Sequence, residues 1–258
     1  MKLNKYSKDF DLTGRLAVVT GASEGIGREL SIGLAGAGAD VIVCSRREQK
    51  LLEVKKEIES LGRKGEVFLL DVCKLNEIEK LKNFIVDRFA KIDILINSAG
   101  FTPTKPAWEI TEAEWDMTMD VSFKGTFFCS QIIGSIMRKN QYGKIINLSS
   151  TFARSSIPNR SIYSAYKAGI SRLTEVLATE WAPDGIRVNA IAPTAVRTPT
   201  REELLKGDVL KNVLSRIPLG RLATPQDLIG ATVFLTSPAS DFVTGQTLFV
   251  DGGWVAAR

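Results

Sequence analysis

Residues 15–27 have the sequence RLAVVTGASEGIG, in which an apolar run is followed directly by a glycine-rich turn. The run is rich in Val, Leu and Ala, which is typical of a strand buried on both faces of a parallel sheet. A helical pattern begins at the end of the turn. Glycines in this setting permit a tight turn and let a pyrophosphate rest on the N–H groups of the helix N-terminus. The same turn could merely connect a strand to a helix.

Apolar runs and amphipathic stretches alternate along the rest of the chain. The expected strands are residues 15–20, 40–46, 65–71, 92–99, 144–150, 186–193 and 246–251. The expected helices are residues 25–37, 49–61, 75–89, 112–138, 162–181, 201–215 and 226–236. This alternation predicts βαβ units with right-handed crossovers. We therefore expect one Rossmann-type α/β domain over residues 1–258, a doubly wound parallel sheet of seven strands with helices on both faces, and a loosely ordered segment at residues 1–11.

The composition excludes several classes of protein. The chain has no His, which removes Ser-His-Asp chemistry and the commonest zinc sites, and we expect no metal. Its three Cys are far apart, as suits a reducing cytosol. The net charge of +5 is spread along the chain rather than gathered as in a nucleic-acid-binding surface. No signal peptide or membrane-spanning run is evident, so we expect a cytoplasmic protein that binds neither nucleic acid nor membranes.

The residues after the second expected strand indicate which dinucleotide would bind. An acidic residue usually stands there when the ribose 2′-OH of NAD is held, whereas an arginine accommodates the 2′-phosphate of NADP. Ser45 and Arg46 occupy this place, so we favour NADP(H) over NAD(H). The alternative is that Arg46 and Arg47 are solvated charges at the start of the next helix. Glu24, in the glycine-rich turn, argues against NADP because its carboxylate could repel the extra phosphate.

Asp71 ends the third expected strand. Its carboxylate could cap the following helix, or it could accept a hydrogen bond from the amino group of an adenine. The spacing does not decide between these two interpretations.

Tyr163 and Lys167 stand at i and i+4 near the start of an expected helix, so they share a face. A phenol has a pKa near 10, and lowering that pKa by about 3 units requires roughly 4 kcal/mol of stabilisation of the phenolate. A neighbouring ammonium favours the phenolate. Tyr166, adjacent to the lysine, is expected to lie on another face. Ser149 and Ser150 follow the fifth expected strand, where a hydroxyl could polarise a substrate oxygen or cap a turn.

Taken together, these motifs resemble those of the short-chain dehydrogenase/reductase family, and the resemblance extends from about Leu12 to Gly253. Sugar-acid dehydrogenases and 3-oxoacyl-carrier-protein reductases have the most similar overall pattern. The matching segments are TGASEGIG (20–27), DV (71–72), NSAG (97–100), Ser150, Tyr163 with Lys167, IRVNAIAP (186–193), VTGQ (243–246) and VDGG (250–253).

The resemblance implies an oxidoreductase that transfers a hydride between the nicotinamide and a secondary alcohol or ketone, and a homotetramer. Tyr163 would be the acid/base, Lys167 would hold the nicotinamide ribose and lower the tyrosine pKa, and Ser150 would orient the carbonyl. The expected cofactor-binding residues are Gly21, Ser23, Gly25, Ile26, Gly27, Ser45, Arg46, Asp71, Val72, Asn97, Ala99, Gly100, Tyr163, Lys167, Pro193, Val196 and Thr198.

Two positions depart from the family pattern. Ser122 stands where the family usually has a fourth catalytic residue, an Asn that helps to hold a water in the proton relay. Thr194 stands where a Gly commonly follows the proline, so its Cβ would crowd the nicotinamide loop or reshape the substrate pocket. We expect Ser122 to take the place of the Asn in the catalytic set.

The identity of the substrate is the feature that the sequence determines least. We expect residues 101–108, 151–162 and 194–211 to form the substrate pocket. These segments contain Arg154, Arg160, Arg197 and Arg201, which could hold a carboxylate or phosphate, although exposed arginines in loops are usually only solvated. A sugar acid and a 3-oxoacyl compound both remain candidates. The alternative to an enzyme is a non-catalytic NADP(H)-binding sensor of the same fold. Such a sensor would be expected to lack Tyr163 or Lys167, and both residues are present.

Overall fold

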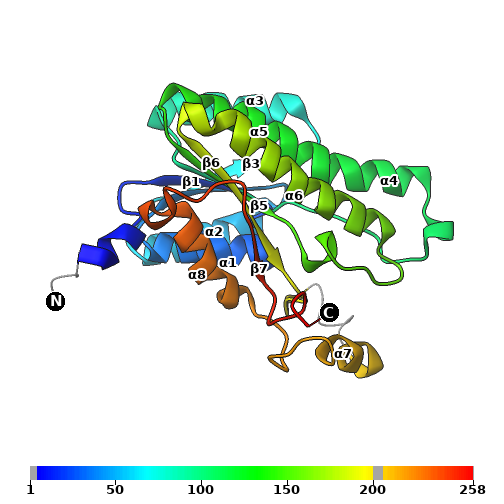
Figure 1. Cartoon of the computed structure of the whole chain (residues 1–258). Coiled ribbons are helices and arrows are strands. Elements are labelled where there is room, and N and C mark those ends of the chain that lie inside the picture. The colour runs from blue at the N-terminus through cyan, green and yellow to red at the C-terminus, as the bar shows by residue number, and fades with distance from the viewer. Residues whose placement is uncertain (1–4, 200–205, 258) are drawn as a thin grey trace.

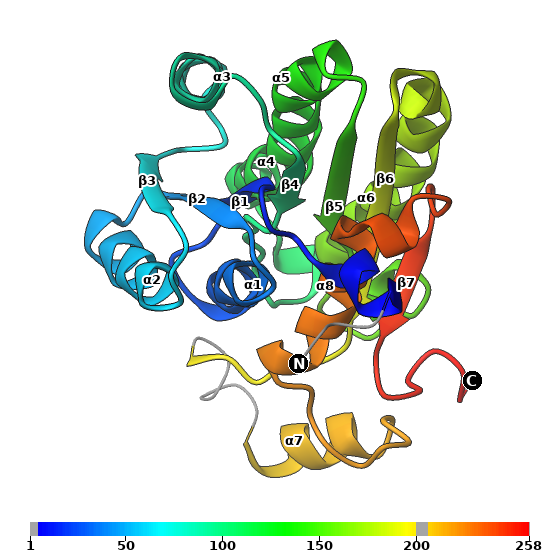
Figure 2. The same cartoon turned by 90° about the vertical axis from the view of Figure 1, so that its left-hand side faces the viewer.

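The structure, a computed structural model, describes residues 5–199 and 206–257. Within them, seven parallel strands form one sheet in the order β3-β2-β1-β4-β5-β6-β7 (Figures 1 and 2). The strands are β1 (Leu16–Thr20), β2 (Asp40–Ser45), β3 (Gly65–Leu69), β4 (Ile94–Asn97), β5 (Gly143–Leu148), β6 (Ile186–Pro193) and β7 (Thr247–Val250). The predicted fold class is confirmed.

Helices cover both faces of the sheet. They are α1 (Gly25–Gly36), α2 (Glu48–Ser60), α3 (Leu75–Phe89), α4 (Glu112–Met119), α5 (Gly125–Lys139), α6 (Ser161–Trp181), α7 (Gly207–Leu214) and α8 (Ile229–Thr236). α1, α2 and α8 lie on one face, α3, α5 and α6 lie on the other, and α7 lies apart from both layers (Figure 2). Each layer encloses its own apolar core, because every covering helix buries one side against the sheet.

The strands differ in how deeply they are buried. All residues of β1 and β4 are buried, as a strand covered on both faces requires. The edge strands β3 and β7 are only partly buried, although the apolar character of their sequences is also typical of strands covered on both faces. Each edge strand has a neighbour on one side alone, which leaves more of it in contact with solvent.

The helix expected over residues 112–138 is interrupted. α4 begins with a capping box, in which Thr111 Oγ1 accepts from Glu114 N and Glu114 Oε2 accepts from Thr111 N. A single π-helical turn over residues 120–124 then separates α4 from α5. Such turns insert an extra residue into a helix and often occur at functional sites. Here the turn contains Ser122.

The two ends of the chain also differ in part from expectation. Residues 5–10, expected to be loosely ordered, form a 3₁₀-helix, and the ring of Phe10 lies 6.4 Å from that of Phe234. The helix expected over residues 201–215 begins at Gly207, while its first five residues lie outside the described part of the chain. The helix expected over residues 226–236 starts as a 3₁₀ turn before α8.

Candidate active site

Strand order reverses between β1 and β4, which run side by side although two strands separate them in the chain. In parallel sheets the crevice for a ligand opens at the carboxyl ends of such a pair. Thr20, the last residue of β1, connects the end of β1 to the segment directly after β4. Its Oγ1 accepts hydrogen bonds from Ser98 N at 3.1 Å and from Ala99 N at 3.3 Å. Thr20 is not among the cofactor-binding residues expected from the sequence.

The glycines after β1 are required by the geometry of the turn. Gly21 and Gly25 have φ values of +68° and +59°, a region that residues with a Cβ rarely adopt. A Cβ on Gly21 would lie 2.8 Å from the backbone of Ala99, and one on Gly27 would lie 2.4 Å from the carbonyl oxygen of Gly21. The turn is thus pressed against the end of β4. Ile26, in the first turn of α1, packs against the core.

The two arginines after β2 have different surroundings. Arg47 donates from Nε and Nη2 to Ser23 Oγ at 3.2 and 2.8 Å, and Arg47 N donates to Ser45 Oγ at 3.1 Å. Arg46 is exposed, and no carboxylate in residues 5–199 or 206–257 forms an ion pair with it. Arg47, for which sequence analysis proposed no binding role, is therefore the guanidinium bound to the glycine-rich turn.

Glu24, in the same turn, is paired with two cations. Its Oε1 lies 2.8 Å from Arg47 Nη2, and its Oε2 lies 2.8 Å from Lys50 Nζ. The hydrogen bond from Arg47 and the neighbouring positive charges hold the pKa of Glu24 below its usual value. The repulsion that this carboxylate would exert on an added phosphate is therefore largely offset.

Asp71 does not cap α3, whose N-cap residue is Lys74. Asp71 Oδ1 accepts from Cys73 N at 3.1 Å, and Asp71 N donates to Glu77 Oε2 at 2.7 Å. The carboxylate thus lies in the turn between β3 and the helix. Val72 is buried in the core on the α3 side of the sheet.

The side chain of Asn97 points into the core rather than into the crevice. Its Nδ2 donates to Ser130 Oγ and to Asn147 Oδ1, both at 2.9 Å. Its Oδ1 is buried and has no hydrogen-bond partner in the described part of the chain. Asn97 was expected to bind the cofactor, whereas in the structure its side chain connects β4 to α5 and β5. Gly100 lies close to Ser122, since a Cβ on it would be 3.8 Å from Ser122 Oγ.

Ser122 is buried, and its hydroxyl bonds to the backbone of Phe101. Ser122 Oγ accepts from Phe101 N at 3.0 Å and donates to Phe101 O at 2.9 Å. The carbonyl oxygen of Ser122 accepts from Thr126 Oγ1 at 2.7 Å. The π-helical turn therefore holds the segment that follows β4 in place.

Tyr163 and Lys167 lie together in the first turns of α6. The ammonium of Lys167 is 5.7 Å from the ring centroid of Tyr163, and it donates to the carbonyl oxygen of Leu148 at the end of β5. The sequence predicts that Tyr166 lies on a separate face of the helix, and the structure differs from this prediction. The ring of Tyr166 is 5.2 Å from the same ammonium and 5.3 Å from the ring of Tyr163. Residues at i and i+3 adjoin on a helix, and the long Lys side chain reaches both rings.

The two serines after β5 differ in their contacts. Ser149 Oγ donates to Lys167 O at 3.1 Å and lies 2.8 Å from Ser171 Oγ, so it attaches the strand to α6. Ser150 Oγ accepts from Phe152 N at 3.2 Å. Because the backbone N–H uses an acceptor site, the Ser150 hydroxyl retains its own proton as a donor.

The loop after β6 closes over the glycine-rich turn. β6 ends at Pro193, and Val196 then forms a parallel bridge with Ala223. Thr198 lies over Gly25, where an added Cβ would be 3.5 Å from Thr198 Cγ2. The fold thus brings residues expected to bind the cofactor to one edge of the sheet. They come from this loop, from the glycine-rich turn and from the end of β4. Arg201, a candidate for the substrate pocket, lies outside the described residues.

Residues 5–199 and 206–257 contain no group of three or more potential metal ligands. No helix within those ranges is long and apolar enough to span a membrane.

A protein-family model described as "Enoyl-(Acyl carrier protein) reductase" matches residues 21–255. The 2-dehydro-3-deoxy-D-gluconate 5-dehydrogenase of Dickeya dadantii is 38% identical, and the alignment covers 96% of this chain and 98% of that protein. The chain belongs to the short-chain dehydrogenase/reductase family. It is accordingly an oxidoreductase that acts on CH–OH groups.

Other members of the short-chain dehydrogenase/reductase family are similarly related. The NAD-dependent glycerol dehydrogenase of Listeria innocua is 36% identical, with 98% of this chain and 99% of that one covered. The 3-oxoacyl-[acyl-carrier-protein] reductase of Thermotoga maritima is 36% identical, with 95% and 99% covered. The crystal structure of a gluconate 5-dehydrogenase from Burkholderia cenocepacia in complex with NADP and tartrate superposes with a TM-score of 0.94 at 33% identity, covering 98% of this chain and 100% of that one.

Proposed function

We propose that this short-chain dehydrogenase/reductase transfers a hydride between NADP(H) and a secondary alcohol or ketone of a sugar acid, with Tyr163 as the acid/base. The single observation that carries the proposal is the cluster at the carboxyl edge of the sheet, where the ammonium of Lys167 lies 5.7 Å from the Tyr163 ring beside the end of β5. A sensor that had lost catalysis would not need this pair, so the non-catalytic alternative is not favoured.

The residues of the crevice fit a dinucleotide. The turn at Gly21 leaves no room for a Cβ and opens onto the N-terminus of α1, an arrangement that favours a pyrophosphate. Arg46, exposed at the end of β2, would hold the 2′-phosphate of NADP, and Arg47 would support the turn through Ser23. Asp71, Val72, Ala99, Gly100, Pro193, Val196 and Thr198 would line the remainder of the site, with Asn97 contributing its backbone.

Proton transfer is the part of the chemistry that the chain itself would supply. The acceptor for the hydride would be supplied by NADP⁺ when it is held in this crevice. Tyr163, as the phenolate, would take the proton from the substrate hydroxyl, and the ammonium of Lys167 would stabilise the phenolate charge. Ser150 would donate a hydrogen bond to the same substrate oxygen, because Phe152 N donates to its Oγ and leaves the O–H free to act as a donor. Ser122 would act on this centre by holding Phe101.

A sugar acid is favoured as substrate by the dehydrogenase relative from Dickeya dadantii and by the gluconate 5-dehydrogenase structure. The reductase relative from Thermotoga maritima makes a 3-oxoacyl thioester the second candidate. The test is an assay of the purified enzyme with NADP and NAD on D-gluconate, and with the reduced cofactors on acetoacetyl-CoA. Oxidation of D-gluconate with preference for NADP is expected. Absence of turnover with all of these compounds would contradict the proposal.

We also propose a homotetramer. Apolar side chains on α4 and α6 support it, since Trp115, Met117 and Val176 are each more than two-fifths exposed. Light scattering coupled to size-exclusion chromatography measures the mass directly, and a monomer would contradict this assignment.

A further inference from the structure

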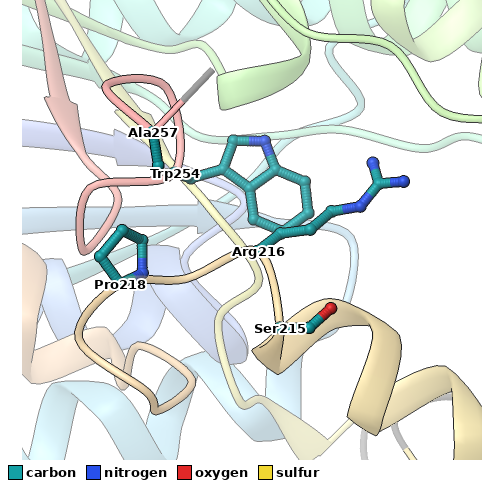
Figure 3. Close-up of a pocket in the computed structure, with 5 residues that line it drawn as sticks. All are labelled: Ser215, Arg216, Pro218, Trp254 and Ala257. Carbon is teal, nitrogen blue, oxygen red and sulfur yellow. The ribbon is translucent and has the colours of Figure 1, made fainter.

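A pocket lies between the end of α7 and the C-terminal tail that follows β7. It is lined by Ser215, Arg216, Pro218, Trp254 and Ala257 (Figure 3). None of these five is among the site residues expected from the sequence. In Figure 3 the side chain of Arg216 runs beside the indole of Trp254 and carries the only charge among the labelled residues.

The walls of the pocket are held in place by several contacts. Trp254 is 4% exposed, and its Nε1 donates to the buried hydroxyl of Ser155 at 3.1 Å. The tail lies directly against the segment after α7, because a Cβ on Gly253 would be 2.9 Å from Pro218 Cγ. The carboxylate of Asp251 accepts from Gly253 N at 2.9 Å, which fixes the turn of the tail. These contacts hold the indole in place without any contribution from a ligand.

Arg216 is the charged group of this pocket. Its Cζ lies 5.8 Å from the centroid of the Trp254 ring. No carboxylate in the described ranges, 5–199 and 206–257, forms an ion pair with it, whereas nearby Arg221 forms two hydrogen bonds with Asp227. A guanidinium beside an aromatic face keeps its N–H groups available at its edges, where a carboxylate can be bound through two parallel hydrogen bonds.

One residue outside the pocket, Phe152, packs between Tyr163 of the proposed reaction centre and the Trp254 wall of the pocket. The ring of Phe152 lies 5.8 Å from that of Tyr163 and 6.1 Å from that of Trp254. Phe152 also follows Ser150 closely, and its backbone N–H bonds to that hydroxyl. A molecule with its reacting carbon at Tyr163 would therefore extend along Phe152 toward Trp254 and Arg216.

We propose that Arg216 binds the carboxylate of an acidic substrate at the end remote from the reacting carbon, with Trp254 orienting the guanidinium. This assignment rests on the proposed function and specifies how that site selects an acid. It differs from a purely structural role, in which Arg216 would only cover the indole and keep α7 in place.

The test compares two compounds that differ at one end. D-Gluconate carries a carboxylate where D-glucitol carries a CH₂OH group, and both are assayed as substrates with NADP. Arg216→Met removes the charge but keeps an unbranched stem over the indole, whereas Arg216→Lys keeps the charge and removes the planar fork. The control is Arg88→Met, which removes an exposed guanidinium that lies 5.2 Å from the Phe84 ring on α3.

We expect Arg216→Met to raise KM for D-gluconate by about 10- to 100-fold, the range for loss of charge-assisted hydrogen bonds. KM for D-glucitol and kcat should change little. Arg216→Lys should give an intermediate KM, and Arg88→Met should match the wild type.

The assignment is overturned if Arg216→Met affects the two compounds equally, which would indicate a structural role, or if the wild type uses D-glucitol as well as D-gluconate. Failure of the proposed function has a different signature. In that case the wild type would oxidise neither compound with either cofactor, and the substrate class and this assignment would both be wrong.

Discussion

The ammonium of Lys167 lies 5.7 Å from the ring of Tyr163 and 5.2 Å from the ring of Tyr166, so one cation adjoins two phenols. The two tyrosines differ in access to a substrate. Tyr166 is 3% exposed and packs in an apolar cluster with Ile162 and Ile170, whereas Tyr163 is only partly buried against that cluster. This difference, rather than distance from the lysine, favours Tyr163 as the acid/base.

Tyr163→Phe should lower kcat by about two to four orders of magnitude, the usual contribution of a positioned acid/base. The substitution removes the hydroxyl and keeps the ring, so cofactor binding should persist. Steady-state kinetics and a titration with NADPH give both quantities. The matched control is Tyr142→Phe, since the Tyr142 hydroxyl is buried without a partner in the described part of the chain, away from the crevice. Near-native turnover of Tyr163→Phe would show that the proton comes from another group.

The adjacent arginines after β2 should give different results. Arg46→Asp should weaken NADP binding by at least about 100-fold and leave NAD binding nearly unchanged, because it removes a phosphate ligand and adds a repelling charge. Arg47→Gln should weaken both cofactors by similar factors, since Arg47 supports the turn through Ser23. Calorimetric titration of each variant with NADP and NAD measures this. If Arg47→Gln alone discriminated against NADP, the 2′-phosphate would belong to Arg47 instead.

Ser122→Ala should lower the free energy of unfolding by about 1–3 kcal/mol, because both backbone groups of Phe101 lose a buried partner. Ser122→Asn supplies a donor and an acceptor again, so it should retain cofactor affinity and keep or raise kcat. Urea unfolding and steady-state kinetics on both variants test this. A folded Ser122→Asn enzyme with a large loss of kcat would show that the hydroxyl has a role other than holding Phe101.

Lys144 provides a test of stability against pH at the opposite edge of the sheet. Its side chain is 0% exposed and bonds to Ser240 Oγ at 3.0 Å and Asp241 Oδ1 at 2.9 Å. Burial lowers the pKa of Lys144 below 10.5, an effect that the bond to Asp241 partly opposes. Between that lowered pKa and 10.5 the unfolded chain binds more protons than the folded one, so the lysine destabilises the fold less as pH rises through this window.

Lys144→Met should therefore be as stable as the wild type or more so near neutral pH, because Asp241 is half-exposed and keeps Arg187 nearby. Its advantage should shrink as pH approaches 10.5. Urea unfolding of both proteins across this pH range gives the difference. A variant whose disadvantage is large and independent of pH would show that the ion pair stabilises the fold.

Local features of this protein were predictable from the sequence alone. Short runs of apolar residues located all seven strands of the sheet, because the composition of a strand buried between two helical layers is a property of each segment by itself. Helix geometry likewise brought Tyr163 and Lys167 together from their spacing. The glycines at 21, 25 and 27 marked the turn, since positive φ values and close backbone contact exclude a Cβ.

Contacts between distant segments were decided by the tertiary structure. That Arg47 rather than Arg46 contacts Ser23, and that Asn97 points into the core, depends on how β1, β2 and β4 lie beside one another. The contact between Phe152 and Trp254 joins residues about a hundred positions apart. Periodicity carries no information on such pairs, because their distance depends on the crossovers and on the packing of helices against the sheet. The sequence alone thus determined the strands, the turn and the Tyr–Lys pair, whereas only the folded chain determined which side chains surround them.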